Sequence, residues 1–286
     1  MEGRSKARRL RDGLLRGALW LCGLLTCALL AGLLGYVLWR GLGHVSWALL
    51  TGRRSYLEGT DGILPNLLNT LYLILLSLAA ALPLGVGAAV YLTEYARGRR
   101  WVAAVEFAAE TLAGIPSIIF GLVGMLFFVR LLGFGTGVLA GGLTLSVMIL
   151  PLVLRTTQEA LKSVPQSYRE GALGLGAGRW RTVRTVVLPG AADGIVTGCI
   201  LAVGRIVGES AALLFTAGAA ASLGGFFRAL YAPSAPLSVA LYVYANEYGD
   251  LDTAMAIATV LLAVTLVINL LAAWTGRGLK QREGGR

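Results

Sequence analysis

Apolar residues follow one another along this chain in six runs, each about as long as a helix that crosses a lipid bilayer. A helix spans the roughly 30 Å of hydrocarbon with about 20 residues, and short polar or charged segments separate the runs. The pattern predicts an all-α, polytopic membrane protein with six transmembrane helices. The runs extend from Gly17 to Trp39, Asn66 to Leu92, Leu112 to Leu132, Thr136 to Thr157, Ala191 to Ala217 and Thr253 to Thr275.

The composition supports a membrane protein and excludes two other classes. The 286 residues are 56% hydrophobic and only 14% charged, and the mean hydropathy is +0.73. Soluble domains carry about 25% charged residues, so a soluble enzyme and a disordered chain are both excluded.

The first run follows a basic stretch, as in a secretory signal peptide, but it is longer than the usual apolar part of about 7 to 15 residues. We therefore expect the first run to remain in the protein as a transmembrane helix and not to be removed as a signal peptide.

Positive charges are distributed unevenly among the segments that join the runs. Nineteen Lys and Arg residues lie before Gly17, around Arg99, between Arg155 and Arg184, and after Thr275. The alternate segments hold five. Because cytoplasmic loops carry the excess of Lys and Arg, both termini are predicted to be cytoplasmic. This topology, with a contribution from anionic membrane lipid, explains the net charge of +10 without nucleic acid as a partner.

Two of the joining segments are longer than a turn requires. From Trp101 to Thr111, Glu106 and Glu110 share one helical face, opposite an apolar face. This segment is predicted to be either an interfacial amphipathic helix or the start of the third spanning helix. The segment from Gly218 to Asp252, on the predicted external side, is rich in aromatic and acidic residues. Loops of this length are usually functional or disordered, and the aromatic residues argue against disorder.

The segment from Glu159 to Gly190 carries the most specific local signals. Pro165 ends the preceding helix, and Ser167 with Glu170 has the S-x-x-E spacing of a capping box, which predicts a short helix beginning near Tyr168. Glycines at positions 174, 176 and 178 disfavour its continuation, and a second short helix is predicted after them. Exposed apolar side chains on such a helix favour a protein docking surface. An interfacial helix lying on lipid is the alternative.

The spacing within this segment resembles a family motif. Read from Glu170, the sequence gives E-G-A-x3-G-x9-V-x-L-P, which resembles the E-A-A-x3-G-x9-I-x-L-P pattern of the membrane subunits of ABC importers. It departs from that pattern at Gly171 and Val186, and the spacing is kept. The resemblance implies a type I ABC importer (MetI-like) permease fold, with a coupling helix that sits in a groove of a separate ATP-binding subunit. The coupling residues that it implies are Tyr168, Glu170, Gly171, Ala172, Gly176, Leu188 and Pro189.

Longer stretches resemble the PstA family of bacterial phosphate importers. They are GVGAAVYLTEYA from Gly85, LAGIPSIIFGL from Leu112, LPLVLRTTQEALKSVPQSYREGALGLGA from Leu150 and GRIVGESAALLFTAG from Gly204. Together they cover most of the chain after about residue 63. That family has Thr-Ala-Pro where this chain has Ser210, Ala211 and Ala212, and loss of the proline is expected to straighten the helix locally.

The resemblance also implies an organisation and a set of partners. Residues 1–62 form a basic tail, the first transmembrane helix and an external loop, residues 63–275 form the permease core with the coupling loop at 159–190, and residues 276–286 form a second basic tail. The implied partners are a PstC-type permease subunit, two PstB-type ATPase subunits and an external PstS-type phosphate-binding protein, with phosphate as cargo. The implied location is the bacterial plasma (inner) membrane.

Two opposite charges lie in the middle of the fifth run. Arg205 and Glu209 would each cost about 2.5 to 3.5 kcal/mol near the bilayer centre. Their spacing of four places them on one helical face, where each neutralises the other. We expect both, with Thr197 and Ser210, to line the path of an oxyanion, which a guanidinium suits. The alternative is a structural ion pair between two membrane subunits. The small and polar residues that share the face are Thr197, Gly198, Gly208, Ala212 and Thr216.

The sequence carries no catalytic, metal-binding or cofactor-binding pattern. None of its three lysines lies in a G-x4-G-K-[ST] loop, and Cys22, Cys27 and Cys199 lie in apolar runs, where a thiol behaves as a small hydrophobic group. We predict a non-catalytic permease subunit of a phosphate importer, with ATP hydrolysis on another polypeptide. The alternatives are a permease for another oxyanion, such as sulfate or molybdate, and an ion-coupled carrier or channel that works alone.

Overall fold

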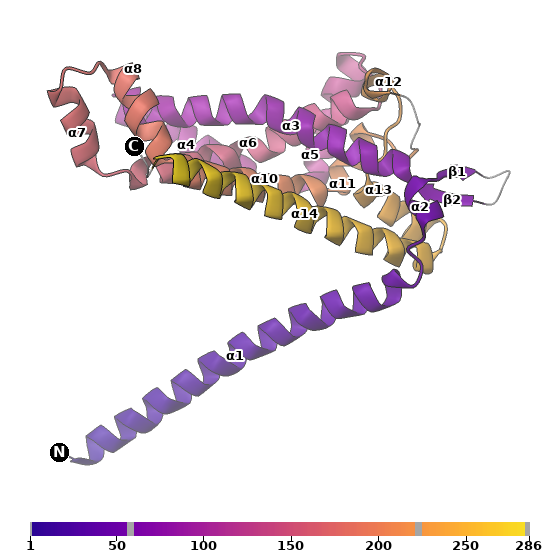
Figure 1. Cartoon of the computed structure of the whole chain (residues 1–286), viewed down its shortest axis with the longest axis horizontal. Helices are drawn as coiled ribbons and strands as arrows, with labels where there is room; N and C mark the ends of the chain where they lie inside the picture. Colours follow the sequence, from indigo (N-terminus) through magenta and orange to yellow (C-terminus); the bar gives the residue numbers. More distant parts are fainter. Residues whose placement is uncertain (1, 56–59, 221–224, 284–286) are drawn as a thin grey trace.

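The computed structural model describes residues 2–55, 60–220 and 225–283, and this part of the chain is almost entirely helical (Figure 1). The exception is a two-stranded antiparallel hairpin formed by β1 (Arg53–Ser55) and β2 (Thr60–Ile63), in which Arg53 pairs with Ile63. The all-α prediction is therefore confirmed, with one short hairpin that the hydrophobic pattern did not indicate.

Four helices in the described chain are long and apolar enough to cross a membrane, and two bent pairs bring the number of spans to six if each pair is one span. This agrees with the six predicted runs. The long helices are α1 (Glu2–Leu42), α3 (Leu64–Val90) with its continuation η1 (Tyr91–Tyr95), α6 (Val138–Ser163) and α14 (Leu251–Glu283). The bent pairs are α4 (Arg99–Ala113) with α5 (Ser117–Gly124) and η2 (Met125–Leu131), and Arg179–Gly190 with α10 (Ala192–Val207).

Short helices join these spans or extend from them. Four lie between α6 and α10, and the others flank the hairpin or lie between α10 and α14 (Figure 1). They are α2 (Trp47–Thr51), α7 (Gln166–Gly174), α8 (Arg179–Thr182), η3 (Val183–Val187), α9 (Leu188–Gly190), α11 (Ala211–Thr216), α12 (Phe226–Tyr231), α13 (Leu237–Tyr242) and η4 (Val243–Glu247).

The centre of the bundle is the packing of α3 and α10 against α6. Leu73 of α3, Ile149 of α6 and Ala202 of α10 belong to one cluster of buried apolar side chains. Hydroxyl groups also join α3 to α6: the Oγ of Ser77 donates to the carbonyl oxygen of Gly142 at 3.1 Å, and the Oγ of Ser146 donates to the carbonyl oxygen of Ser77 at 3.2 Å. These three helices therefore form the body that positions the remaining elements.

Helix α1 diverges from this body (Figure 1). It contacts α14 near its last turns, where the Oγ1 of Thr259 donates to the carbonyl oxygen of Val37 at 3.3 Å. Along most of its length large apolar side chains such as Leu19 and Trp20 are 73% and 81% exposed. The helix also begins at Glu2 rather than near Gly17, because the basic tail continues it.

The segment from Trp101 to Thr111 lies in α4, and a sharp bend separates it from α5. Helix α4 meets α5 at 98°, and its acidic residues contact α6. Glu110 forms an ion pair with Arg155, and the Oε1 of Glu106 lies 3.7 Å from the Nζ of Lys162. The segment therefore does not run straight into the third apolar run, and both the interfacial helix and the bent start of the third span stay predictions.

The described part of the segment from Gly218 to Asp252, which the sequence predicts to be ordered, contains the short helices α12, α13 and η4, and its middle lies in the protein interior. Leu237 and Val239 of α13 are fully buried. The side-chain Nδ2 atoms of Asn66 and Asn69 on α3 donate to the carbonyl oxygen of Ala235 at 2.9 and 3.3 Å. The segment thus folds back against the bundle and completes its core.

Close approach of α3 and α6 at Gly85 gives a testable prediction. A Cβ at Gly85 would lie 2.7 Å from Cγ1 of the buried Val153 side chain, whereas a Cβ at Gly87 in the same helix meets nothing within 4 Å. We expect Gly85→Ala to lower the stability by about 1–3 kcal/mol through overpacking. Gly87→Ala should be neutral or stabilising by up to about 1 kcal/mol, because alanine favours helix. Thermal unfolding in detergent measures both, and equal midpoints would contradict the packing.

Candidate functional site

The coupling loop forms a projection at one end of the molecule (Figure 1). Helix α7 is followed by a bend at Gly176, whose φ is +83°, and then by α8, so the predicted arrangement of two short helices around a glycine bend is confirmed. No residue of α7 is buried. Tyr168, Leu175 and Trp180 are 62%, 92% and 61% exposed. An exposed apolar surface of this kind is typical of a docking site for another protein.

The predicted capping box is wrong. Helix α7 begins at Gln166, directly after Pro165, and no side chain caps it. Pro165 has φ −58° and ψ 140°, an extended conformation that starts the helix two residues before the predicted position. Ser167 then lies inside the first turn, where its hydroxyl does not occupy the N-cap position that the box requires.

The residues of the implied coupling motif divide into two groups. Glu170, Gly171 and Gly176 are exposed with Tyr168 at the projecting end, and Ala172 is half-buried. The remaining motif residues, Leu188 and Pro189, are half-buried in α9 at the base of α10. A Cβ at Gly171 would meet nothing within 4 Å, so the departure from the family alanine leaves the packing of this chain unchanged. The motif therefore connects an exposed surface to the start of a spanning helix.

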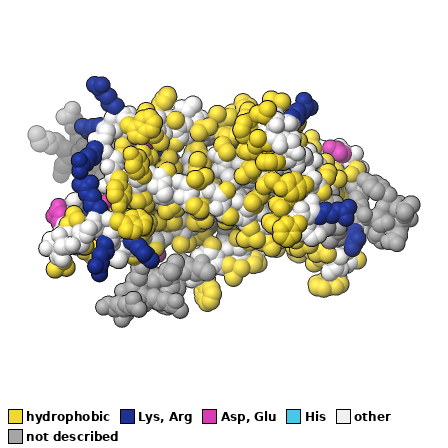
Figure 2. All heavy atoms as spheres, turned by 90° about the horizontal axis from the view of Figure 1, so that it is seen from above, with side chains coloured by type: hydrophobic (Ala, Val, Ile, Leu, Met, Phe, Trp, Pro, Cys, Tyr) yellow, Lys and Arg dark blue, Asp and Glu magenta, His cyan; other side chains and the backbone are white. Residues whose placement is uncertain are grey.

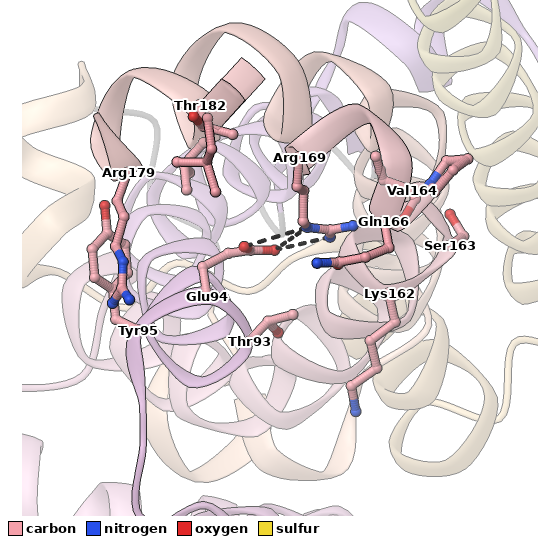
Figure 3. Close-up of a pocket in the computed structure, with 13 residues that line it drawn as sticks. Thr93, Glu94, Tyr95, Lys162, Ser163, Val164, Gln166, Arg169, Arg179 and Thr182 are labelled. Carbon is pink, nitrogen blue, oxygen red and sulfur yellow. Dashed lines mark hydrogen bonds and ion pairs between the residues drawn. The ribbon is translucent and has the colours of Figure 1, made fainter. Parts of the chain in front are cut away.

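The sequence did not predict the ion pair that joins α7 to η1. Arg169 of α7 and Glu94 of η1 form an ion pair in which Nη2 and Oε1 are 2.9 Å apart, and their side chains are only 13% and 14% exposed (Figure 3). The signals that could have indicated it are a carboxylate directly after an apolar run and an arginine within the motif, but nothing local connects the two. Beside the pair lies a cavity of about 620 Å³, lined by residues of η1, the end of α6, α7 and α8.

The structure separates the two charges of the fifth run. Helix α10 ends at Val207, and α11 begins only at Ala211. The Oε1 of Glu209 accepts a hydrogen bond from the backbone N–H of Ala212 at 3.1 Å, and no ion pair joins Glu209 to Arg205 in the described chain. The predicted pair is wrong because the helix break removes the i, i+4 geometry, and the carboxylate instead satisfies a free amide of the next helix. The expectation of a straighter helix at Ser210 is also wrong, since the break occurs without the proline.

The predicted pathway residues lie partly on an open face of α10. Thr197, Leu201 and Arg205 follow one another at intervals of four and are exposed, whereas Gly198 and Ala202 beside them are buried. Gly208 is exposed, but Ala212 and Thr216 of the predicted stripe are buried. Glu209 and Ser210 are half-buried. The structure therefore places Arg205 and Thr197 on one exposed face of α10. Glu209 and Ser210 lie in the break between α10 and α11.

Comparisons with known proteins agree with this architecture. Residues 81–283 match the family described as "Binding-protein-dependent transport system inner membrane component". The chain is 36% identical over 282 residues to the probable ABC transporter permease protein YqgI of Bacillus subtilis, covering 94% of this chain and 96% of that protein. It is also 36% identical over 240 residues to the phosphate transport system permease protein PstA of Yersinia pestis, covering 82% and 79%.

A solved structure shows the same fold. It is that of a bacterial alginate ABC transporter in complex with an alginate pentasaccharide-bound periplasmic protein, with a TM-score of 0.67 at 17% identity over 94% of this chain and 96% of that chain. The hydrophobic spans, the projecting helices α7 and α8 and the match over residues 81–283 together place this chain in the family of binding-protein-dependent transport system inner membrane components, the non-catalytic permease subunits of ABC transporters.

Proposed function

We propose that this chain is a permease subunit of a phosphate importer. A separate ATPase binds α7 and α8 and drives transport through this contact. The observation that carries the proposal is the α7–α8 projection, which exposes Tyr168, Leu175 and Trp180 at one end of the molecule. Exposed apolar side chains at the tip of a helical projection favour a groove in another protein. The implied partners are two PstB-type ATPase subunits, a PstC-type permease and an external PstS-type phosphate-binding protein.

The side of the membrane follows from the distribution of charge. Both termini lie toward the end of the molecule that bears α7 (Figure 1). Figure 2 shows an apolar band around the middle of the molecule and Lys and Arg side chains at both ends, with more of them at the α7 end. Because Lys and Arg collect on the cytoplasmic side, we place α7 and both termini in the cytoplasm and the β1–β2 hairpin outside the bacterial plasma membrane.

The open face of α10 supports a translocation path along this helix. Arg205 lies in the last turn of α10, is exposed and has no ion-pair partner in the described chain. An ionised side chain within a span is costly when it faces lipid, so this face requires water or a second membrane subunit. A PstC-type permease would close the path opposite Arg205 and Thr197, with Glu209 and Ser210 at the helix break. The guanidinium then offers a phosphate oxyanion paired hydrogen bonds.

Phosphate is the cargo that the relatives favour, because several of the proteins that this chain resembles are named as phosphate transport permeases. Sulfate and molybdate present similar oxygens to a guanidinium, so Arg205 does not distinguish among them. The external binding protein would select the cargo before it reaches the path. Competition by unlabelled sulfate or molybdate during phosphate uptake separates these cargoes.

The docking surface gives one prediction. Leu175→Asp adds a charge at a side chain that is 92% exposed, so the fold should be unaffected while the ATPase loses an apolar contact. We expect the amount of ATPase that copurifies in mild detergent, and the uptake of phosphate, to fall about tenfold. Phe227→Asp is the control, because Phe227 is 82% exposed at the opposite end of the molecule and should leave ATPase binding unchanged. Full ATPase capture by Leu175→Asp would refute docking at this surface.

The path gives a second prediction. Arg205→Gln removes the positive charge from the open face of α10, and we expect phosphate uptake to fall about tenfold or more, as for the loss of a hydrogen bond to a charged group. The ATPase should still copurify, because α7 is unchanged. Arg130→Gln, at the far end of η2, is the matched control and should transport normally. Phosphate uptake at the wild-type rate by Arg205→Gln would contradict a role for Arg205 in the path.

A further inference from the structure

Helix α7 has no apolar anchor of its own. None of its residues is buried, and only Arg169 and Ala172 are even half-buried. The cavity of about 620 Å³ beside it leaves α7 without close packing on that side. A helix that another protein pushes on must nevertheless be held firmly, and apolar packing does not supply that attachment here.

The guanidinium of Arg169 supplies it by joining three elements. Its Nε and Nη2 donate to the Oε1 of Glu94 at 3.2 and 2.9 Å, which ties α7 to η1 at the end of α3 (Figure 3). Its Nη1 donates to the carbonyl oxygen of Val164 at 2.6 Å, and Nη2 also donates to the carbonyl oxygen of Leu161 at 2.8 Å. These carbonyls lie at the C-terminal end of α6, where helix carbonyls lack intrahelical partners and attract a cation.

The groups that Arg169 binds belong to one body. Ala89 of α3 and Leu92 of η1 share a buried apolar cluster with Leu154 and Leu161 of α6. Glu94 and the end of α6 therefore move together. The contacts also require the planar fork of an arginine, because the compact ammonium of a lysine does not reach a carboxylate and two carbonyls in fixed directions.

We propose that Arg169 and Glu94 are positioning residues that transmit the movement of α7 to the spanning helices α3 and α6. This inference rests on the proposed function, in which α7 is the helix that the ATPase moves. With the pair intact, a displacement of α7 displaces the ends of α3 and α6. Without it, α7 tilts into the adjacent cavity, and ATP is hydrolysed without moving the path.

The test uses the complete complex with its ATPase subunits, reconstituted in liposomes with the external binding protein. Uptake of labelled inorganic phosphate and hydrolysis of ATP are measured on the same vesicles. We expect Arg169→Lys and Glu94→Gln to lower the phosphate taken up per ATP hydrolysed about tenfold, as for a broken buried pair, while the ATPase stays bound. Tyr95→Phe is the control, because Tyr95 lines the same cavity, lies in η1 outside the α7–α8 projection, and forms no ion pair in the described chain. It should keep the wild-type ratio.

A cross-link separates transmission of movement from a requirement for charge. Glu94→Cys with Arg169→Cys is made in a chain whose three native cysteines are alanine. Bridging the two introduced thiols with a short bis-methanethiosulfonate reagent should restore the ratio, and reduction of the bridge should abolish it again. The bridge carries no charge, so recovery supports a mechanical link.

Three outcomes would overturn the proposal. They are a wild-type ratio in both single variants, loss of bound ATPase in both, which would assign the pair to docking, and failure of the bridged form to recover although its unfolding temperature matches that of the unsubstituted complex. Failure of the proposed function is distinguishable, because the unsubstituted chain would then neither retain an ATPase nor take up phosphate.

Discussion

The close packing of α3 against α6 is the interaction on which the rest of this structure depends. In lipid the hydrophobic effect does not pull helices together, so association relies on small residues and on hydrogen bonds between helices. Gly85 and Gly142 let these helices approach until an added Cβ would collide with the neighbouring side chain. Ser77 and Ser146 add hydroxyl-to-carbonyl bonds across the same contact. The two helices therefore form a rigid pair against which α10 and α13 pack.

This pair determines the position of both candidate functional regions. At one end, α6 and η1 hold Arg169 and thereby the projecting helix α7. Along its length, α6 receives the buried face of α10, where a Cβ at Gly194 would collide with Ala160 of α6. Arg205 lies three turns further along α10, in its last turn, and is exposed. The proposed docking helix α7 and the exposed Arg205 are thus both positioned by the same body, as the proposed transmission of movement requires.

Polar contacts accompany two breaks in the helices, one between α10 and α11 and one between α4 and α5. Between α10 and α11, Glu209 binds the amide of Ala212, and the carbonyl oxygen of Glu209 accepts a hydrogen bond from the Oγ of Ser238 at 2.7 Å. Between α4 and α5 the chain turns by 98°, and the acidic face of α4 meets basic residues of α6. At the break between α10 and α11, side chains therefore satisfy backbone groups that the break frees, as membrane proteins require.

The sequence by itself determined the number of spans, the uneven charge of their ends and the two short helices of the coupling loop. These depend on the length of apolar runs and on glycine and proline, whose effects are local. Only the tertiary structure decided that Glu94 binds Arg169, 75 residues away, that α13 lies in the core, and that Glu209 caps a helix instead of pairing with Arg205. Each depends on which elements come together in space, and the spacing of residues along one helix holds no information about that.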